Sequence, residues 1–259
     1  MPSRGSSAAL SLRGLSKAFG STLAVDRLDL EVPRGSFFGF VGPNGAGKTT
    51  TLSMATGLLR PDAGTAHVMG HDVWSDTVRA KQLVGILPDG LRLFDRLTGL
   101  ELISYSGLLR GMDRPLVVER AHELLGALGL EEEGGTLVVD YSAGMTKKIS
   151  LACALIHAPR LLVLDEPFEG VDPISTSTIR QILEGYATSG GTVILSSHVM
   201  DLIQRLCDRV AIVAAGQIRA AGTLDQVRAG MTLEERFVNL VGGQTDVGEG
   251  LAWLRSSSD

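Results

Sequence analysis

Four short apolar runs stand out along the chain, each set off by glycine, proline or polar residues. They are Ser36–Val41, Leu161–Leu164, Thr192–Ser196 and Arg209–Ala214. Runs this short, without polar alternation, are typical of strands that a parallel sheet buries on both faces. The segments with the apolar spacing of helices that follow them are Lys48–Gly57, Pro173–Ser189 and Val199–Cys207. This alternation predicts an α/β fold with a parallel-sheet core and right-handed crossovers.

Two other regions have different patterns. Apolar and polar residues alternate over Leu10–Leu15 and Leu23–Val32, on either side of the turn sequence FGST, which predicts an antiparallel hairpin at one edge. Between residues 91 and 159, apolar residues recur three to four positions apart, over Leu97–Arg110, Leu116–Leu130 and Lys147–His157. That spacing predicts an all-helical subdomain inserted into the α/β core.

The length of 259 residues is enough for one well-packed domain, which we expect to span residues 8–225. Residues 8–90 and 160–225 would form its α/β core, and residues 91–159 its helical subdomain. Residues 226–259 would follow as a C-terminal extension. Its short helices are predicted over Leu224–Ala229 and Leu233–Leu240, and Gly242–Asp259 is a polar tail that we expect to be loosely ordered.

Composition excludes several classes of protein. The chain has 29 acidic and 24 Lys and Arg residues, a net charge of −5, so no general basic field exists and we expect no nucleic-acid partner. The sequence shows neither a membrane-spanning apolar stretch nor a signal peptide, and we expect a cytoplasmic chain unless a partner holds it at a membrane. Cys153 and Cys207 lack paired spacing and are predicted to be inert core thiols.

The strongest chemical signal is a phosphate-binding loop. The segment that fits GxxxxGK[ST] consists of Gly42, Pro43, Asn44, Gly45, Ala46, Gly47, Lys48 and Thr49. It lies between a predicted strand and a predicted helix, as binding requires, and this context disfavours an accidental glycine-rich turn. The backbone N–H groups would wrap the phosphates, Lys48 would bridge the β- and γ-phosphates, Thr49 would ligate Mg²⁺ and Thr50 would contact the α-phosphate.

An acidic pair ends the second apolar run, where Leu164 is followed by Asp165, Glu166 and Pro167. Carboxylates at the carboxyl end of such a strand would lie beside the phosphate loop. Asp165 would hold Mg²⁺ through its water shell, and Glu166 would act as general base toward the attacking water. An ordinary strand followed by solvated acids would be the better interpretation only if no phosphate loop were present.

A third element, Tyr141–Met145 (YSAGM), precedes a helix upstream of the acidic pair. With both earlier motifs, it makes the chain resemble the ATP-binding cassette (ABC) ATPases over about Leu10 to Leu240. The resemblance implies a P-loop NTPase (RecA-like) core with an antiparallel β edge and an inserted helical subdomain. It also implies that Ser142 and Gly144 contact the γ-phosphate of ATP bound to a second copy.

Within this element, Ala143 and Met145 depart from the commonest LSGGQ form, which we expect to alter the contact without abolishing it. Ser142 could also serve as an ordinary helix N-cap, a role compatible with the functional one. In the same family comparison, Glu169–Pro173 is similar to the D-loop, which crosses the dimer interface; alone, it would be a turn before a helix.

Three further positions match the family. His198 resembles the switch histidine that contacts the γ-phosphate and steadies Glu166, whereas the remaining histidines are interpreted as structural: His67, His71, His122 and His157. Phe19 lies where the family places an adenine-stacking aromatic, although a core phenylalanine of an edge strand would fit the same pattern. Asp89 replaces the usual Q-loop glutamine and would bind the metal through water.

The resemblance extends to a particular class of ABC ATPase. YSAGM, DEPFEGVDP and TLEERFVNLVGG are similar to segments in ATPase subunits of bacterial export-type transporters whose permease is a separate chain. The likeness implies an active ATPase that uses ATP and Mg²⁺, dimerises with a second copy, and lies on the inner face of the cell membrane through an integral-membrane permease. A groove near Asp89–Arg110 would receive the permease, and the apolar residues expected there are Leu91, Leu93, Phe94 and Leu97.

Other functions remain to be weighed. A soluble ABC ATPase of translation or DNA repair usually has two cassettes, coiled coils or zinc modules, none of which is evident in the sequence. A GTPase would need an NKxD sequence and a kinase would not need YSAGM, so both are disfavoured. Intact Glu166 and His198 argue against a regulatory ATP sensor without turnover.

Overall fold

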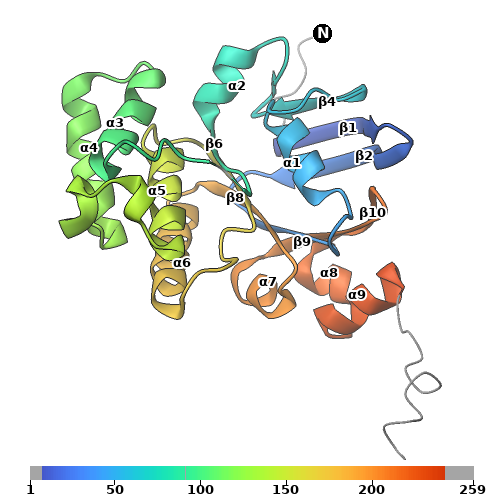
Figure 1. Ribbon diagram of the computed structural model, residues 1–259. Helices are drawn as coiled ribbons and strands as arrows, with labels where there is room; N and C mark the ends of the chain where they lie inside the picture. The colour runs from blue at the N-terminus through green and yellow to red at the C-terminus, as the bar shows by residue number, and fades with distance from the viewer. Residues whose placement is uncertain (1–7, 91, 243–259) are drawn as a thin grey trace, which may run out of the picture.

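A computed structural model describes residues 8–90 and 92–242, and these form two β-sheets with helices around them (Figure 1). The antiparallel sheet contains β1 (Ala8–Phe19), β2 (Thr22–Pro33), β4 (Ala63–Val68) and β5 (His71–Asp72), in the order β2-β1-β4-β5. The predicted hairpin is confirmed as β1 and β2. β1 also pairs with β4, so it is an inner strand, and β2 forms the edge.

The core sheet has the strand order β10-β9-β3-β8-β7-β6. Its strands are β3 (Phe37–Val41), β6 (Val84–Leu87), β7 (Leu161–Asp165), β8 (Thr192–Ser197), β9 (Arg209–Ala214) and β10 (Gln217–Thr223). All neighbours pair in parallel except β9 and β10, which are antiparallel. The four predicted core strands are confirmed, whereas β6 and β10, the strands at the two sheet edges, were not predicted.

Helices surround the core sheet, and α3, α4 and α5 gather at the side remote from β1 and β2 (Figure 1). The helices are α1 (Lys48–Ala55), α2 (Thr77–Leu83), α3 (Gly99–Leu109), α4 (Arg114–Leu128), α5 (Ala143–Leu155), α6 (Pro173–Thr188), α7 (Met200–Leu206), α8 (Leu224–Arg228) and α9 (Leu233–Val241), with 3₁₀ turns at Glu132–Gly135 and Val138–Asp140. Each predicted helix is confirmed within a few residues, and α2 is additional. The predicted tail after Gly242 lies outside the described residues.

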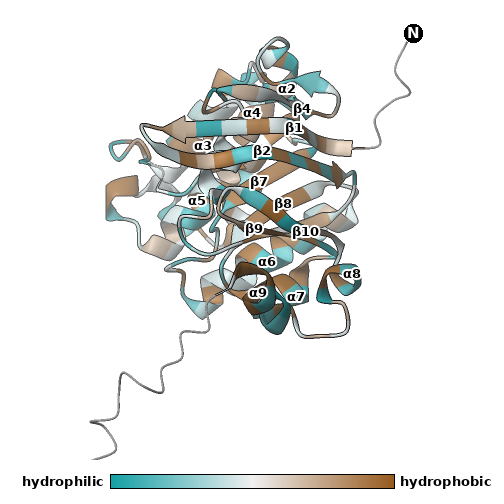
Figure 2. Ribbon diagram, turned by 90° about the vertical axis from the view of Figure 1, so that its right-hand side faces the viewer, coloured by the Kyte–Doolittle hydropathy of each residue, from teal (hydrophilic) through white to brown (hydrophobic). Residues whose placement is uncertain are grey.

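Four strands of the core sheet are buried along nearly their whole length, which explains their uninterrupted apolar sequences: β3, β7, β8 and β9. Along β7, Leu161 and Val163 pack into the cluster shared with the antiparallel sheet. Leu162 and Leu164 point to the opposite cluster, which contains residues of the helical subdomain. Along β1 and β2, apolar and polar residues alternate instead, because one side of that sheet faces solvent (Figure 2).

Local capping sets where several helices begin. Thr98 and Glu101 form a reciprocal capping box at α3, with the Thr98 N–H donating to Glu101 at 2.8 Å. The Asp172 carboxylate accepts the N–H groups of Ile174 and Ser175 at the start of α6. These contacts satisfy amide groups that a helix start leaves unpaired.

Both cysteine thiols pack against the apolar core. Cys153 and Cys207 are free, and their burial raises the pKa of Cys153 to about 11 and raises that of Cys207 as well. Both thiols therefore stay protonated at neutral pH, whereas nucleophilic chemistry requires the thiolate. Both side chains thus pack against the core as predicted, Cys207 buried and Cys153 partly buried, and their inertness stays a prediction.

His157 gives folding a dependence on pH. Burial, together with the Arg110 guanidinium, lowers the pKa of His157 to about 4, so the folded imidazole stays neutral. The unfolded chain takes up a proton near pH 6.5. We therefore expect stability to fall as pH drops from about 6.5 toward 4, by on the order of 1 kcal/mol at pH 5 once partial solvation is allowed for.

Urea unfolding at pH 7 and pH 5 would test this effect of His157. The His157→Gln variant should lose less stability than the wild type between the two conditions. Carboxylates with lowered pKa values, such as Asp72 and Asp172, also reduce stability as they protonate. This loss is the same in both proteins and therefore cancels when they are compared. Equal losses in the two proteins would contradict the expectation.

Candidate active site

A cleft of about 450 Å³ opens where β3 leads into α1, at the carboxyl ends of the core strands. Its lining consists of Phe19, Ala24, Pro43, Asn44, Gly45, Ala46, Gly47, Lys48, Thr49, Thr50, Asp89, Glu166, Glu169 and His198. The structure thus brings most predicted site residues together from distant parts of the sequence. Gly42 and the buried Asp165 are not part of this lining, and the contacts described next connect them to it.

The phosphate loop ends in an uncapped helix. Gly47 precedes α1 with φ 97, and a Cβ there would lie 2.4 Å from the Ala24 carbonyl oxygen, so glycine is required on two counts. Among the described residues, no side chain caps α1, which leaves its first amides available to an anion. The Lys48 ammonium is buried and donates to the Gly42 carbonyl at 2.8 Å, below the same loop.

The acidic pair is anchored by a serine that the sequence did not single out. The hydroxyl of Ser196, at the end of β8, donates to the buried carboxylate of Asp165 and accepts the Glu166 N–H at 3.0 Å. Glu166 has φ 45, a left-handed conformation uncommon for a residue with a side chain. Its carboxylate lies 3.7 Å from the Lys48 Nζ and 3.2 Å from the His198 Nδ1.

This arrangement suits proton transfer beside a bound phosphate. The Glu166 carboxylate sits between a buried ammonium and an imidazole at the wall of the cleft. A carboxylate held in this way can accept a proton from a nearby water, while the ammonium and helix amides attract negative charge. The geometry is therefore compatible with a bound phosphate and with a base next to it.

Phe19 and Asp89 both line the cleft. The Phe19 ring is 52% exposed, with the Lys17 Nζ 5.8 Å from its centroid, so it is a surface platform and not a core side chain. An exposed aromatic face of this kind can stack on a nucleobase. Asp89 is 47% exposed at its side chain, and its Oδ1 lies 4.0 Å from the Lys147 Nζ.

The Tyr141–Met145 element lies apart from this cleft. Within the described residues, Ser142 and Gly144 are outside the cleft lining, at the start of α5. The exposed Ser142 caps α5 by accepting the Met145 N–H at 3.3 Å. Gly144 is buried, and a Cβ there would lie 2.6 Å from the Asp172 Oδ2, so this glycine is needed for packing against α6.

The expected apolar groove is only partly present on the surface. Phe94 is 59% exposed and meets Tyr105 edge-to-face, with ring centroids 5.4 Å apart. Leu93 and Leu97 are partly buried and pack against the core cluster, so their place in a groove that receives the permease stays a prediction. Leu91 lies outside the described residues.

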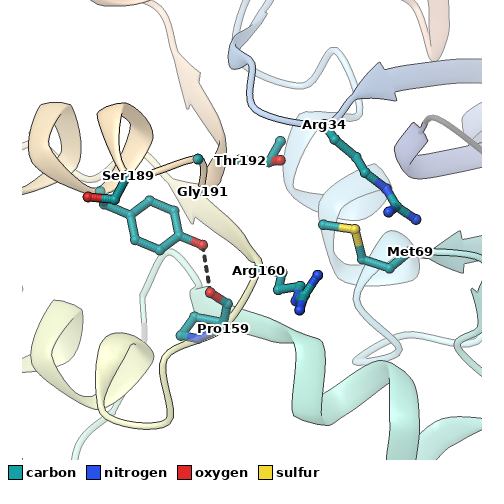
Figure 3. A pocket seen from close by; sticks show the side chains of 9 residues that line it. Arg34, Met69, Pro159, Arg160, Ser189, Gly191 and Thr192 are labelled. Carbon is teal, nitrogen blue, oxygen red and sulfur yellow. Dashed lines mark hydrogen bonds between the residues drawn. The ribbon is translucent and has the colours of Figure 1, made fainter.

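Glu169 lines the cleft but was assigned only to the predicted D-loop, and Ala24 was not predicted. Neither carries a local signal, because the hairpin and the D-loop approach the phosphate loop only in the folded chain. Ser196 offered a weak signal as a polar residue ending an apolar strand. A separate hollow of about 320 Å³ lies at the amino ends of β7 and β8, beside Arg34 and Arg160, at the opposite end of these strands (Figure 3).

The fold and the cleft define the class of protein: a P-loop nucleotide-binding protein with an inserted helical subdomain. Residues 25–169 match the family profile described as ABC transporter. The chain belongs to the ABC transporter family, and it is an ATP-binding subunit that couples ATP hydrolysis to transport. In the described part of the chain, no helix is long and apolar enough to cross a membrane.

Individual relatives agree with this assignment. The daunorubicin/doxorubicin resistance ATP-binding protein DrrA of Streptomyces peucetius is 38% identical over 86% of this chain and 68% of its own. The linearmycin resistance ATP-binding protein LnrL of Bacillus subtilis is 37% identical over 83% of this chain and 69% of its own. A solved ATP-binding subunit of an ABC transporter superposes with a TM-score of 0.83, at 27% identity, covering 90% of this chain and 99% of that structure.

Proposed function

We propose that the chain powers export of a small organic molecule through a separate integral-membrane permease, with two copies closing around ATP. DrrA and LnrL support export, since both are named for resistance to such molecules and as ATP-binding proteins. A soluble ABC ATPase of translation or DNA repair has less support from these names. The permease would hold the chain at the inner face of the cell membrane.

In this proposal the cleft binds ATP. The adenine stacks on Phe19, Thr50 contacts the α-phosphate, and Lys48 offsets the charge of the β- and γ-phosphates. Mg²⁺ would be held by Thr49, Asp165 and Asp89, whose oxygens are the donors it prefers, and it would neutralise phosphate charge. Asp165 fits this role because its buried carboxylate takes part in no ion pair among the described residues.

Hydrolysis would depend on Glu166. Its carboxylate accepts the proton from the water that attacks the γ-phosphate, which makes that water a stronger nucleophile. His198 contacts the Glu166 carboxylate at 3.2 Å and so restricts its orientation while facing the γ-phosphate. Ser196 holds Asp165 and the Glu166 backbone in a fixed relation at the ends of two neighbouring strands.

The observation that supports a dimer is that Ser142 lies apart from the cleft of the same chain. The helix start with Ser142 is exposed, and its amides suit an anion, yet the phosphate loop of the same chain lies elsewhere. A second copy related by twofold symmetry would supply its Ser142 to this cleft and receive the reciprocal contact. Each site is then complete only in the pair.

The permease would dock on the helical subdomain. Phe94 and Tyr105 place adjoining aromatic rings on its surface, and Leu108 and Leu109 are exposed on α3. Aromatic residues are enriched where proteins form interfaces, because they bury a large area with few rotamers to fix. Closure of the dimer would move this surface and so transmit force to the permease helices.

A complementation experiment tests the shared site. Ser142→Asp keeps an N-cap but repels the γ-phosphate, and Lys48→Ala damages the phosphate loop. Each variant alone should hydrolyse ATP at least about tenfold slower than the wild type. An equal mixture forms some dimers with one intact site, so turnover should recover to about a quarter of the wild-type rate.

The matched control is Thr98→Asp, which replaces the N-cap of α3 in the same subdomain. This variant should retain wild-type turnover, because the N-cap remains and Thr98 lies outside the cleft. A mixture no more active than its two components would refute the shared site. Wild-type activity of Ser142→Asp alone would refute it equally.

A further inference from the structure

Lys147 reaches from the helical subdomain to the backbone of the proposed general base. It belongs to α5, the helix that Ser142 caps, and its Nζ donates to the Glu166 carbonyl oxygen at 3.0 Å. We propose that Lys147 is a positioning residue, which couples the orientation of α5 to the orientation of Glu166. The inference rests on the proposed role of Glu166 as general base.

Glu166 needs such support because of its backbone conformation. With φ 45, it occupies a region that residues with a side chain rarely adopt unless their surroundings hold them there. The Ser196 hydroxyl holds its N–H from the sheet side, at 3.0 Å. Lys147 holds its carbonyl from the helical side, and the Glu169 N–H adds a longer bond of 3.3 Å to the same oxygen. The two peptide groups that flank the Glu166 side chain are thus fixed by two different parts of the molecule.

The second contact of Lys147 points to the same coupling. Its Nζ lies 4.0 Å from the Asp89 carboxylate, in the connection that leaves β6 for the helical subdomain. The Lys147 side chain is only 19% exposed, so its ammonium is largely confined between these two partners. A half-exposed ion pair of this length adds little stability by itself. The charge-assisted bond to the carbonyl is therefore the stronger link.

The consequence for hydrolysis follows from the rigidity of α5. Ser142 and Lys147 lie on one continuous helix, so a shift of its Ser142 end also shifts the Lys147 backbone. Any such shift changes how well the ammonium supports the Glu166 carbonyl, and with it the direction of the carboxylate. Small errors in the position of a base reduce the rate of a step much more than they reduce substrate binding.

Replacing Lys147 with methionine tests the inference, because it removes the ammonium while keeping a long side chain. In the purified full-length chain, Lys147→Met should lower kcat about tenfold or more, with the Kd for a fluorescent ATP analogue changed less than about threefold. Lys147→Arg should retain most of the activity, since it keeps a cationic donor. Lys81→Met, which removes an exposed lysine on α2, is the matched control and should behave as the wild type.

A double-mutant comparison separates positioning from general damage. In a Glu166→Gln background, Lys147→Met should cause little further loss of kcat, because its effect passes through the base already removed. A merely structural role predicts that the two losses multiply. The inference would be overturned if Lys147→Met left kcat unchanged, or if it weakened ATP binding by the same factor by which it lowered kcat. It would also be overturned if the losses of kcat from the two substitutions multiplied in the double variant. If Glu166→Gln alone turned over ATP normally, the proposed function of Glu166 would fail instead.

Discussion

Replacing Glu166 with glutamine should lower the rate of ATP hydrolysis by about 10²- to 10⁴-fold while ATP still binds. The amide keeps the size and shape of the carboxylate but cannot accept a proton from water. The backbone contacts of residue 166 with Ser196 and Lys147 do not involve the carboxylate and would persist. Steady-state turnover and nucleotide binding, measured on the same preparation, check both halves of this expectation.

The same Glu166→Gln variant should accumulate as an ATP-bound dimer, because closure of the two copies around ATP is no longer followed by hydrolysis. Light scattering should show twice the monomer mass with ATP and Mg²⁺ but not with ADP. Glu119→Gln serves as the control, because it replaces an exposed carboxylate on α4 with an amide, and it should hydrolyse ATP at the normal rate. Normal turnover by the Glu166→Gln variant would remove Glu166 from the mechanism.

Lys48→Ala should act on binding as well as on turnover. Loss of one charge-assisted contact to phosphate costs roughly 1.5–3 kcal/mol, which corresponds to about a 10- to 150-fold weaker affinity for ATP. Because Lys48 is buried and also donates to the Gly42 carbonyl, the loop itself should loosen. Titration with a fluorescent ATP analogue measures the change.

Adenosine provides the internal control for Lys48→Ala, since it has no phosphate. Any weak binding of adenosine at Phe19 should be equal in the wild type and the variant. A Kd for ATP that stays within about twofold of the wild type would contradict the proposed contact between Lys48 and the phosphates.

Strands buried on both faces were predictable from the sequence because both of their faces need apolar side chains. The strand β7 shows this, with Leu161 to Leu164 contributing alternately to the two core clusters. The edge strands were not predictable in the same way. β6 is four residues long and contains Gly85, and β10 mixes Arg219 with small residues, so neither has a clear period.

The residues of the candidate site also differ in whether the sequence alone could predict them. The phosphate loop and the acidic pair were predictable because their chemistry is local in sequence and each follows a strand. Ser196 and Lys147 were not, because their roles depend on hydrogen bonds to residues 30 and 19 positions away. Such partners are set by sheet order and helix packing, which no local pattern contains.

The uncapped start of α1 links nucleotide to folding itself. Among the described residues no side chain satisfies its first amides, which lie at the point where phosphates would bind. ATP bound here as proposed would supply the missing partners, and the folded state would gain stability with the logarithm of its concentration. An energy-depleted cell would therefore hold this subunit in a form that is both idle and easier to unfold.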